Sequence, residues 1–180
     1  AFAAQQACGG NWTNTITLTL PIAYAAPFAF DFDTPETTPE MEFYVSGTNG
    51  WFVGTDQNNT LDEEGNPTVG GGALYVSSDN GLTASYNTGS STMSTASMLI
   101  SIAPGQETHI TFDYKVVGES GWDYFTVYLV PFGVEMSDSY RVLSGTSQVP
   151  SWTLKDIVLS PDYAGIYNLI FRWNNDNMYG

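Results

Sequence analysis

Cysteine, histidine and basic side chains are scarce in this chain. It has one cysteine, Cys8, so no internal disulfide can form, and its single histidine leaves too few ligands for a zinc site. Four basic residues stand against 19 acidic ones, a net charge of -15, which argues against nucleic acid and anionic membranes as partners. Divalent cations, neutral glycans and basic protein surfaces stay open, as does the interpretation that the charge only keeps a secreted domain soluble.

The chain also lacks a long apolar run and the motifs of several enzyme classes. No run reaches the ~18 residues that a membrane span needs. The glycines at 70–72 precede a predicted strand and no lysine follows them, so they do not form a phosphate-binding loop. His109 lies on the polar face of a predicted strand with no nucleophile motif nearby, so we expect a surface residue. These absences favour a protein that is not an enzyme.

What the chain has in abundance is the material of strands and turns. It is 42% hydrophobic and 14% aromatic, which excludes intrinsic disorder and provides for one core. Apolar and polar residues alternate in many short stretches, whereas helical periodicity does not recur. The alternation predicts strands over Thr15–Leu20, Phe28–Phe32, Ala73–Ser77, Leu82–Tyr86, Ser97–Ile102, Thr108–Val117, Trp122–Val130, Trp152–Leu159 and Tyr167–Trp173.

Turn-forming residues separate these stretches, for example at Gly47–Gly50, Asp79–Gly81, Pro104–Gly105 and Pro161–Asp162. Many short strands with such turns are typical of an antiparallel two-sheet β-sandwich of jelly-roll type. The segment Gly54–Gly72 is too long and too polar for a hairpin turn, so we expect an exposed loop there.

The start of the chain is compatible with two origins. Ala1 and Ala3 form an A-x-A arrangement similar to the end of a signal peptide, but neither a charged nor an apolar region precedes them. The segment is equally compatible with a linker from an upstream domain. We therefore predict a leading segment over residues 1–26, either linker or mature N-terminus, and one sandwich domain over residues 27–180.

Acidic residues at the ends of predicted strands indicate a calcium site. Ca²⁺ takes about six to eight oxygen ligands from carboxylates, amides and backbone carbonyls. Asp31 and Asp33 flank Phe32 on one predicted strand, and Asp123 begins another with its side chain on the inward face. We predict a structural Ca²⁺ held by Asp31, Asp33 and Asp123. The alternative is that Asp123 caps a turn through backbone amides.

Three tryptophans, Trp51, Trp122 and Trp152, lie at predicted junctions of loop and strand. Sugar rings stack on exposed aromatic faces, so these residues are candidates for a glycan-binding platform. Packing in the core or at its rim is the alternative for each of them.

Several short blocks carry a family resemblance that extends over about residues 28–173. They are Phe30–Asp33, Gly50–Trp51, Gly70–Gly81, Ser97–Ser101, Ile110–Tyr114, Asp123–Tyr128, Trp152–Leu154 and Leu169–Arg172. In this order and spacing they resemble the choice-of-anchor J and cleaved-adhesin domains, MAM-like jelly rolls on surface and secreted proteins of Bacteroidetes.

The resemblance implies a jelly roll outside the cell that contacts a protein or a glycan, often beside a secreted peptidase or glycosidase. A calcium site is common in the family. The family closes with one more strand, whereas this chain stops at Gly180. The resemblance therefore implies that the last strand is missing or is supplied from elsewhere.

We therefore predict a noncatalytic adhesion or recognition module of an exported, cell-surface protein. One alternative is a carbohydrate-binding module accessory to a secreted glycoside hydrolase or peptidase. The other is a structural domain that is completed by a strand from a partner or from a second copy in a homo-oligomer. An unpaired strand edge or an open apolar groove would favour this last alternative.

Overall fold

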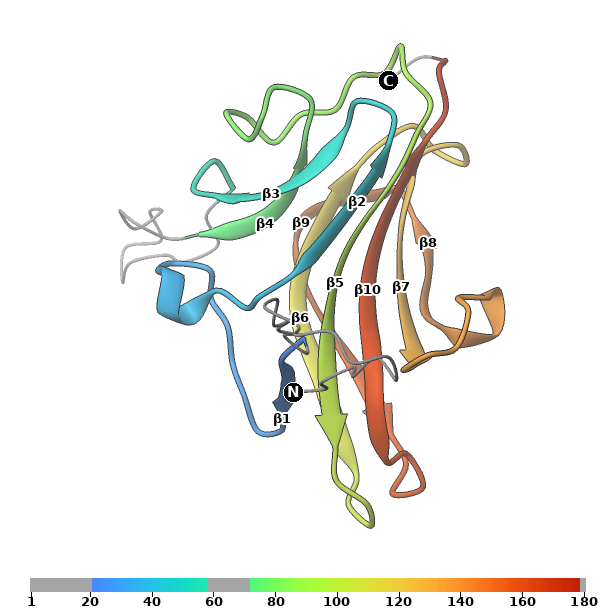
Figure 1. The fold of residues 1–180 in the computed structure, drawn as a ribbon. Helices are drawn as coiled ribbons and strands as arrows, with labels where there is room; N and C mark the ends of the chain where they lie inside the picture. Colours follow the sequence, from blue (N-terminus) through green and yellow to red (C-terminus); the bar gives the residue numbers. More distant parts are fainter. Residues whose placement is uncertain (1–20, 58–71, 179–180) are drawn as a thin grey trace, which may run out of the picture.

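A computed structural model describes residues 21–57 and 72–178 of the chain (Figure 1). These residues form ten strands and two short 3₁₀ helices, with no α-helix among them. In chain order the elements are β1 (Ala23–Ala25), η1 (Pro35–Thr37), β2 (Glu42–Ser46), β3 (Gly50–Gly54), β4 (Ala73–Ser77), β5 (Thr92–Ile102), β6 (Thr108–Val117), β7 (Tyr124–Pro131), η2 (Asp138–Tyr140), β8 (Arg141–Thr146), β9 (Gln148–Leu159) and β10 (Gly165–Asn175).

The largest sheet has six strands and is built around β5 and β10, which pair antiparallel over their whole lengths. β7 pairs with the other edge of β10, and β8 pairs with β7. On the opposite side, β1 and β2 pair with successive stretches of the same edge of β5, so that β1 lies beside Leu99–Ser101 and β2 beside Met93–Ser97. β1 belongs to the leading segment of residues 1–26 by sequence, and it is hydrogen-bonded into this sheet.

Two smaller sheets complete the described part of the chain. β3 pairs antiparallel with β4, and β6 pairs antiparallel with β9. Figure 1 shows β6 and β9 as a second layer behind the main sheet, with β3 and β4 to one side of it. The protein is therefore all-β with several sheets, which is consistent with a β-sandwich.

The core lies between these sheets because alternate residues of the long strands point inward. Val127 of β7 is fully buried, and it belongs to one cluster with buried hydrophobic residues of β5, β6, β9 and β10. The other buried members of this cluster are Met98, Ile100, Ile102, Val116, Phe125, Leu129, Ile157, Leu159, Leu169 and Trp173.

Five rings, which we call the aromatic layer, join all three sheets. They are Trp51, Phe112, Tyr114, Phe125 and Phe171. Phe125 and Phe171 of the main sheet are stacked, with ring centroids 6.3 Å apart. Trp51 of β3 lies 6.2 Å from Phe125, and Phe112 of β6 meets Phe171 edge-on at 5.5 Å. Both small sheets thus rest on the same pair of rings.

A buried polar network closes one end of the core. Asn49, which precedes β3, is fully buried, and its amide nitrogen donates to the Asn175 side chain at 2.9 Å and to Thr92 at 3.2 Å. Its oxygen accepts from the backbone N–H of Asn87 at 2.7 Å. The Asn175 oxygen also accepts from the Trp173 indole at 3.1 Å. The network ties the β2–β3 turn to the end of β10.

The structure confirms most of the predicted strands. β4 and β6 have the predicted bounds, and β5, β7, β9 and β10 contain or overlap the remaining predicted stretches of residues 97–173. The turns at Gly47–Gly50, Pro104–Gly105 and Pro161–Asp162 join successive strands as expected. The predicted strand Thr15–Leu20 and most of the predicted loop Gly54–Gly72 lie outside the described residues.

Two predicted strands are wrong. Phe28–Phe32 forms a bent loop, because Phe32 adopts a φ of 63° and the Asp31 carboxylate accepts a hydrogen bond from the Asp33 N–H. Leu82–Tyr86 is also a loop, in which the Asp79 carboxylate accepts from the backbone and hydroxyl of Thr83. In both places an aspartate side chain provides the backbone with local partners in place of a neighbouring strand.

Truncating a ring of the aromatic layer tests how much the fold depends on it. We expect Phe125→Ala to lower the free energy of unfolding by about 3–5 kcal/mol, because it removes a buried ring and leaves a cavity. Phe132→Ala, at a residue that is 59% exposed, should change it by less than about 0.5 kcal/mol. Urea denaturation of both variants measures the difference, and similar losses for the two would contradict the role given to the layer.

Candidate functional site

A groove of about 610 Å³ opens between β4 and β6. Its volume is in the range of about 300–1,000 Å³ typical of ligand pockets. Gly72–Val76 border it on one side and Thr111–Val117 on the other. The aromatic residues that line it are Phe30, Phe32, Trp51, Tyr75, Tyr86, Phe112, Tyr114, Phe125, Trp152, Phe171 and Trp173.

The groove brings together two of the three tryptophans predicted to bind a ligand. Trp51, from β3, and Trp152, from β9, both line it although they are far apart in the sequence. Trp122 does not line it; its side chain is 60% exposed beside the turn that precedes β7. The sequence alone could not show which of the three tryptophans share a groove, because this depends on how the small sheets pack.

The two groove tryptophans offer different chemistry. The Trp51 indole Nε1 is buried and has no hydrogen-bond acceptor among residues 21–57 and 72–178. A buried donor without a partner costs free energy in the folded state. The Lys115 Nζ lies 5.3 Å from the centroid of the half-buried Trp152 ring. The two side chains form a cation–π contact at the groove border.

Several groove residues were not predicted as ligand-binding, among them Tyr86, Phe112, Tyr114 and Lys115. The alternation of apolar and polar residues puts Phe112 and Tyr114 on one face of β6, and both pack against the core. It carried no signal that this part of the core opens to solvent, because that depends on which strand lies beside β6. Asp31 and Gln57 add polar groups to the lining.

Asp31 and Asp33 organise the loop beside the groove. The Asp33 carboxylate accepts a hydrogen bond from the Gly72 N–H, and a Cβ atom at Gly72 would lie only 1.9 Å from the Phe32 carbonyl oxygen. This close approach requires glycine. Hydrogen bonds from Thr37 and then from the Asp33 N–H hold the pKa of Asp31 below its ordinary value.

Asp123 lies at a different hydrogen-bonded cluster. Its side chain is 1% exposed and accepts from the Tyr86 hydroxyl at 2.6 Å, the Glu119 N–H at 3.1 Å and the Asp176 N–H at 3.2 Å. Burial, and then the bond to Asp123, raises the pKa of Tyr86. The two backbone contacts are those that the turn-capping alternative requires.

The calcium site stays a prediction. Asp31 and Asp33 bond within their own loop and to Gly72, whereas the contacts of Asp123 come from Tyr86, Glu119 and Asp176. Within the described ranges no group of three or more His, Cys, Asp or Glu side chains is arranged to hold a metal ion.

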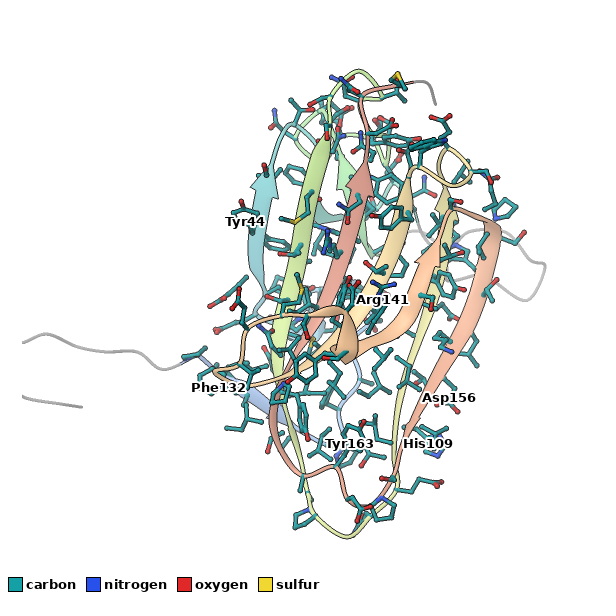
Figure 2. The ribbon with its side chains drawn as sticks, turned by 90° about the vertical axis from the view of Figure 1, so that its right-hand side faces the viewer. Tyr44, His109, Phe132, Arg141, Asp156 and Tyr163 are labelled. Carbon is teal, nitrogen blue, oxygen red and sulfur yellow. The ribbon has the colours of Figure 1, made fainter. Side chains whose placement is uncertain are left out.

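His109 is exposed near the start of β6, as the sequence predicts. Figure 2 shows it beside Asp156 of β9, and its Nδ1 lies 3.0 Å from that carboxylate. Its Nε2 lies 3.3 Å from Glu107. Hydrogen bonds to Asp156 and then to Glu107 raise the pKa of His109 above its ordinary value.

Comparisons with protein-family models, curated proteins and solved structures find no match to this chain. In the part of the chain that the structure describes, no helix is long and apolar enough to span a membrane.

Asp123→Asn tests the role of the buried carboxylate. We expect this substitution to lower the free energy of unfolding by about 1–3 kcal/mol. The asparagine amide has only one oxygen, so its NH₂ group would face a donor that now bonds to a carboxylate oxygen. Turn capping predicts the same loss in calcium and in a chelator, measured by thermal denaturation. A loss seen only with calcium present, together with a wild-type melting temperature that falls in chelator, would show that the residue binds the metal.

The His109 contacts predict a pH dependence. Because its pKa is raised in the folded state, the protonated ring adds stability fully below the unfolded-state pKa of ~6.5, and this contribution is lost as the pH rises through the folded-state pKa. NMR titration should give a His109 midpoint above ~6.5 that falls in Asp156→Asn. A midpoint that the substitution leaves unchanged would contradict the assigned cause.

Proposed function

We propose that this protein is a noncatalytic recognition module of an exported protein at the cell surface, and that its binding site is the groove between β4 and β6. The observation that carries the proposal is an open, aromatic-lined groove in which Trp51 and Trp152 converge from separate sheets. Binding sites are concave and mostly apolar with a few polar groups, and this groove has that composition.

The distribution of charge supports recognition rather than catalysis. The single histidine of the chain bonds to Asp156 and Glu107 and does not line the groove. A net charge of -15 keeps an exported domain soluble and directs it toward neutral or basic partners. The finer parts of the proposal, a jelly roll, a bound Ca²⁺ and a place among the choice-of-anchor J and cleaved-adhesin domains, rest on the sequence resemblance.

A carbohydrate-binding module is the second candidate, and the tryptophans favour it. The Trp152 ring borders the groove, where a sugar ring could stack on it. Trp51 lines the same groove and adds a second aromatic side chain to it. Neutral glycans suit this groove better than anionic ones because of the net charge.

Tryptophan substitutions test both candidates. In a groove that binds a ligand, Trp152→Ala should weaken binding about tenfold or more, because truncating an aromatic side chain that packs on the ligand commonly costs over about 1 kcal/mol. The exposed Trp122→Ala is the matched control and should retain wild-type affinity and melting temperature. Arrays of neutral glycans and of surface proteins, probed with calcium present, give the readout. Binding that depends on Trp122 but not on Trp152 would contradict the assigned site.

A further inference from the structure

We infer that the groove accepts an extended peptide strand of a partner protein, which pairs with the free edges of β4 and β6, those that no described strand occupies. The inference rests on the proposed function, because it names the partner class of the same groove. It follows from how the groove is bordered, from the unpaired strand edges and from the apolar floor.

The border of the groove consists of strand edges. A groove on the face of a sheet is lined by alternate residues of each strand, because successive side chains point to opposite faces. Here the lining residues are consecutive: Gly72–Val76 on one side and Thr111–Val117 on the other. Consecutive residues face a groove together only where it runs along the edge of the strand.

Those two edges have no strand partner within the described residues. β4 pairs only with β3, and β6 pairs only with β9. Each therefore presents a row of backbone N–H and C=O groups on its other edge. A second polypeptide backbone in extended conformation matches such a row in spacing and in polarity. The backbone chemistry of both walls thus specifies a β-strand as the occupant.

The floor of the groove specifies the side chains of that strand. Phe125, Phe171 and Trp173 of the main sheet lie beneath the opening, with Phe112 and Tyr114 beside them. A strand between β4 and β6 would point every second side chain onto these rings and the others to solvent. The partner segment is therefore one in which apolar and polar residues alternate.

Length and charge narrow the partner further. The stretch Thr111–Val117 spans seven residues, so a matching strand has about seven residues and a length of ~23 Å. The protein carries a net charge of -15, and the charged residues that line the groove are Asp31, Asp113 and Lys115. A strand with neutral or basic outward residues is complementary to this charge, and an acidic one is not.

A designed peptide tests the inference on the full chain. The probe alternates isoleucine and threonine over about seven residues between terminal lysines. One control has the same composition with the isoleucines grouped together. A second control keeps the alternating order but carries N-methyl groups on alternate amides, which removes backbone donors and leaves the side chains in place.

We expect the alternating peptide to slow hydrogen exchange of amides in both β4 and β6 at least tenfold, and to bind at least tenfold more tightly than either control. β2 is the internal reference, since no described strand pairs with its second edge and all of its residues are exposed. Amides of β2 should exchange as fast with the peptide as without it. Light scattering should show a monomer with and without the peptide.

Each other result overturns the inference. Equal binding of the N-methylated peptide would show that no backbone pairing occurs. Protection of β2 alone would indicate unspecific edge pairing. Slow exchange along the groove in the peptide-free chain would show that residues 1–20 or 58–71, or a second copy in a dimer, already fill it. If the peptide does not bind but a glycan does, and glycan binding depends on Trp152, the strand hypothesis is refuted and the proposed function stands. If neither the peptide nor a glycan or surface protein binds, both the strand hypothesis and the proposed function are refuted.

Discussion

This architecture depends on one interaction, the contact of both small sheets with a stacked pair of rings in the main sheet. These rings belong to Phe125 and Phe171. In the described residues no strand joins β4 to β6, so backbone hydrogen bonds do not fix the position of either small sheet relative to the other. Trp51 reaches Phe125 from one side and Phe112 reaches Phe171 from the other. The aromatic layer thus substitutes for the missing ladder and sets the width of the opening.

The candidate site is a consequence of the same arrangement. Aromatic rings are large and contact one another at roughly 5–7 Å between centroids, which is about the range found here. They can therefore hold β4 and β6 in place without closing the space between these strands. What opens is a section of core, bordered by strand edges and floored by aromatic rings. The proposed recognition role then needs no separate site built onto the fold, since among residues 21–57 and 72–178 the gap between β4 and β6 supplies both the apolar surface and the unpaired backbone groups.

Strand-level features followed from the sequence for β4, β5, β6, β7, β9 and β10, whereas β1, β2, β3 and β8 were not predicted. β4 and β6 have their predicted bounds because more buried residues alternate with less buried ones along most of their length. β2 was missed because all of its residues are exposed, so it has no alternation to detect. Phe28–Phe32 alternates but bends at Phe32, where local hydrogen bonds of aspartate outweigh the pattern. For the site, the sequence indicated Trp51 and Trp152 as candidates but not their convergence, which is a property of sheet packing between distant segments.

The most direct test of this account measures the separation of the two small sheets in solution. Spin labels on cysteines introduced at the exposed positions Val53 of β3 and Leu154 of β9, in a Cys8→Ser background, report that distance by electron–electron resonance. We predict one narrow distance distribution in the otherwise wild-type chain, and a broad one when Phe125→Ala is added. A distribution that stays equally narrow without the Phe125 ring would contradict the claim that the aromatic layer positions both walls of the groove.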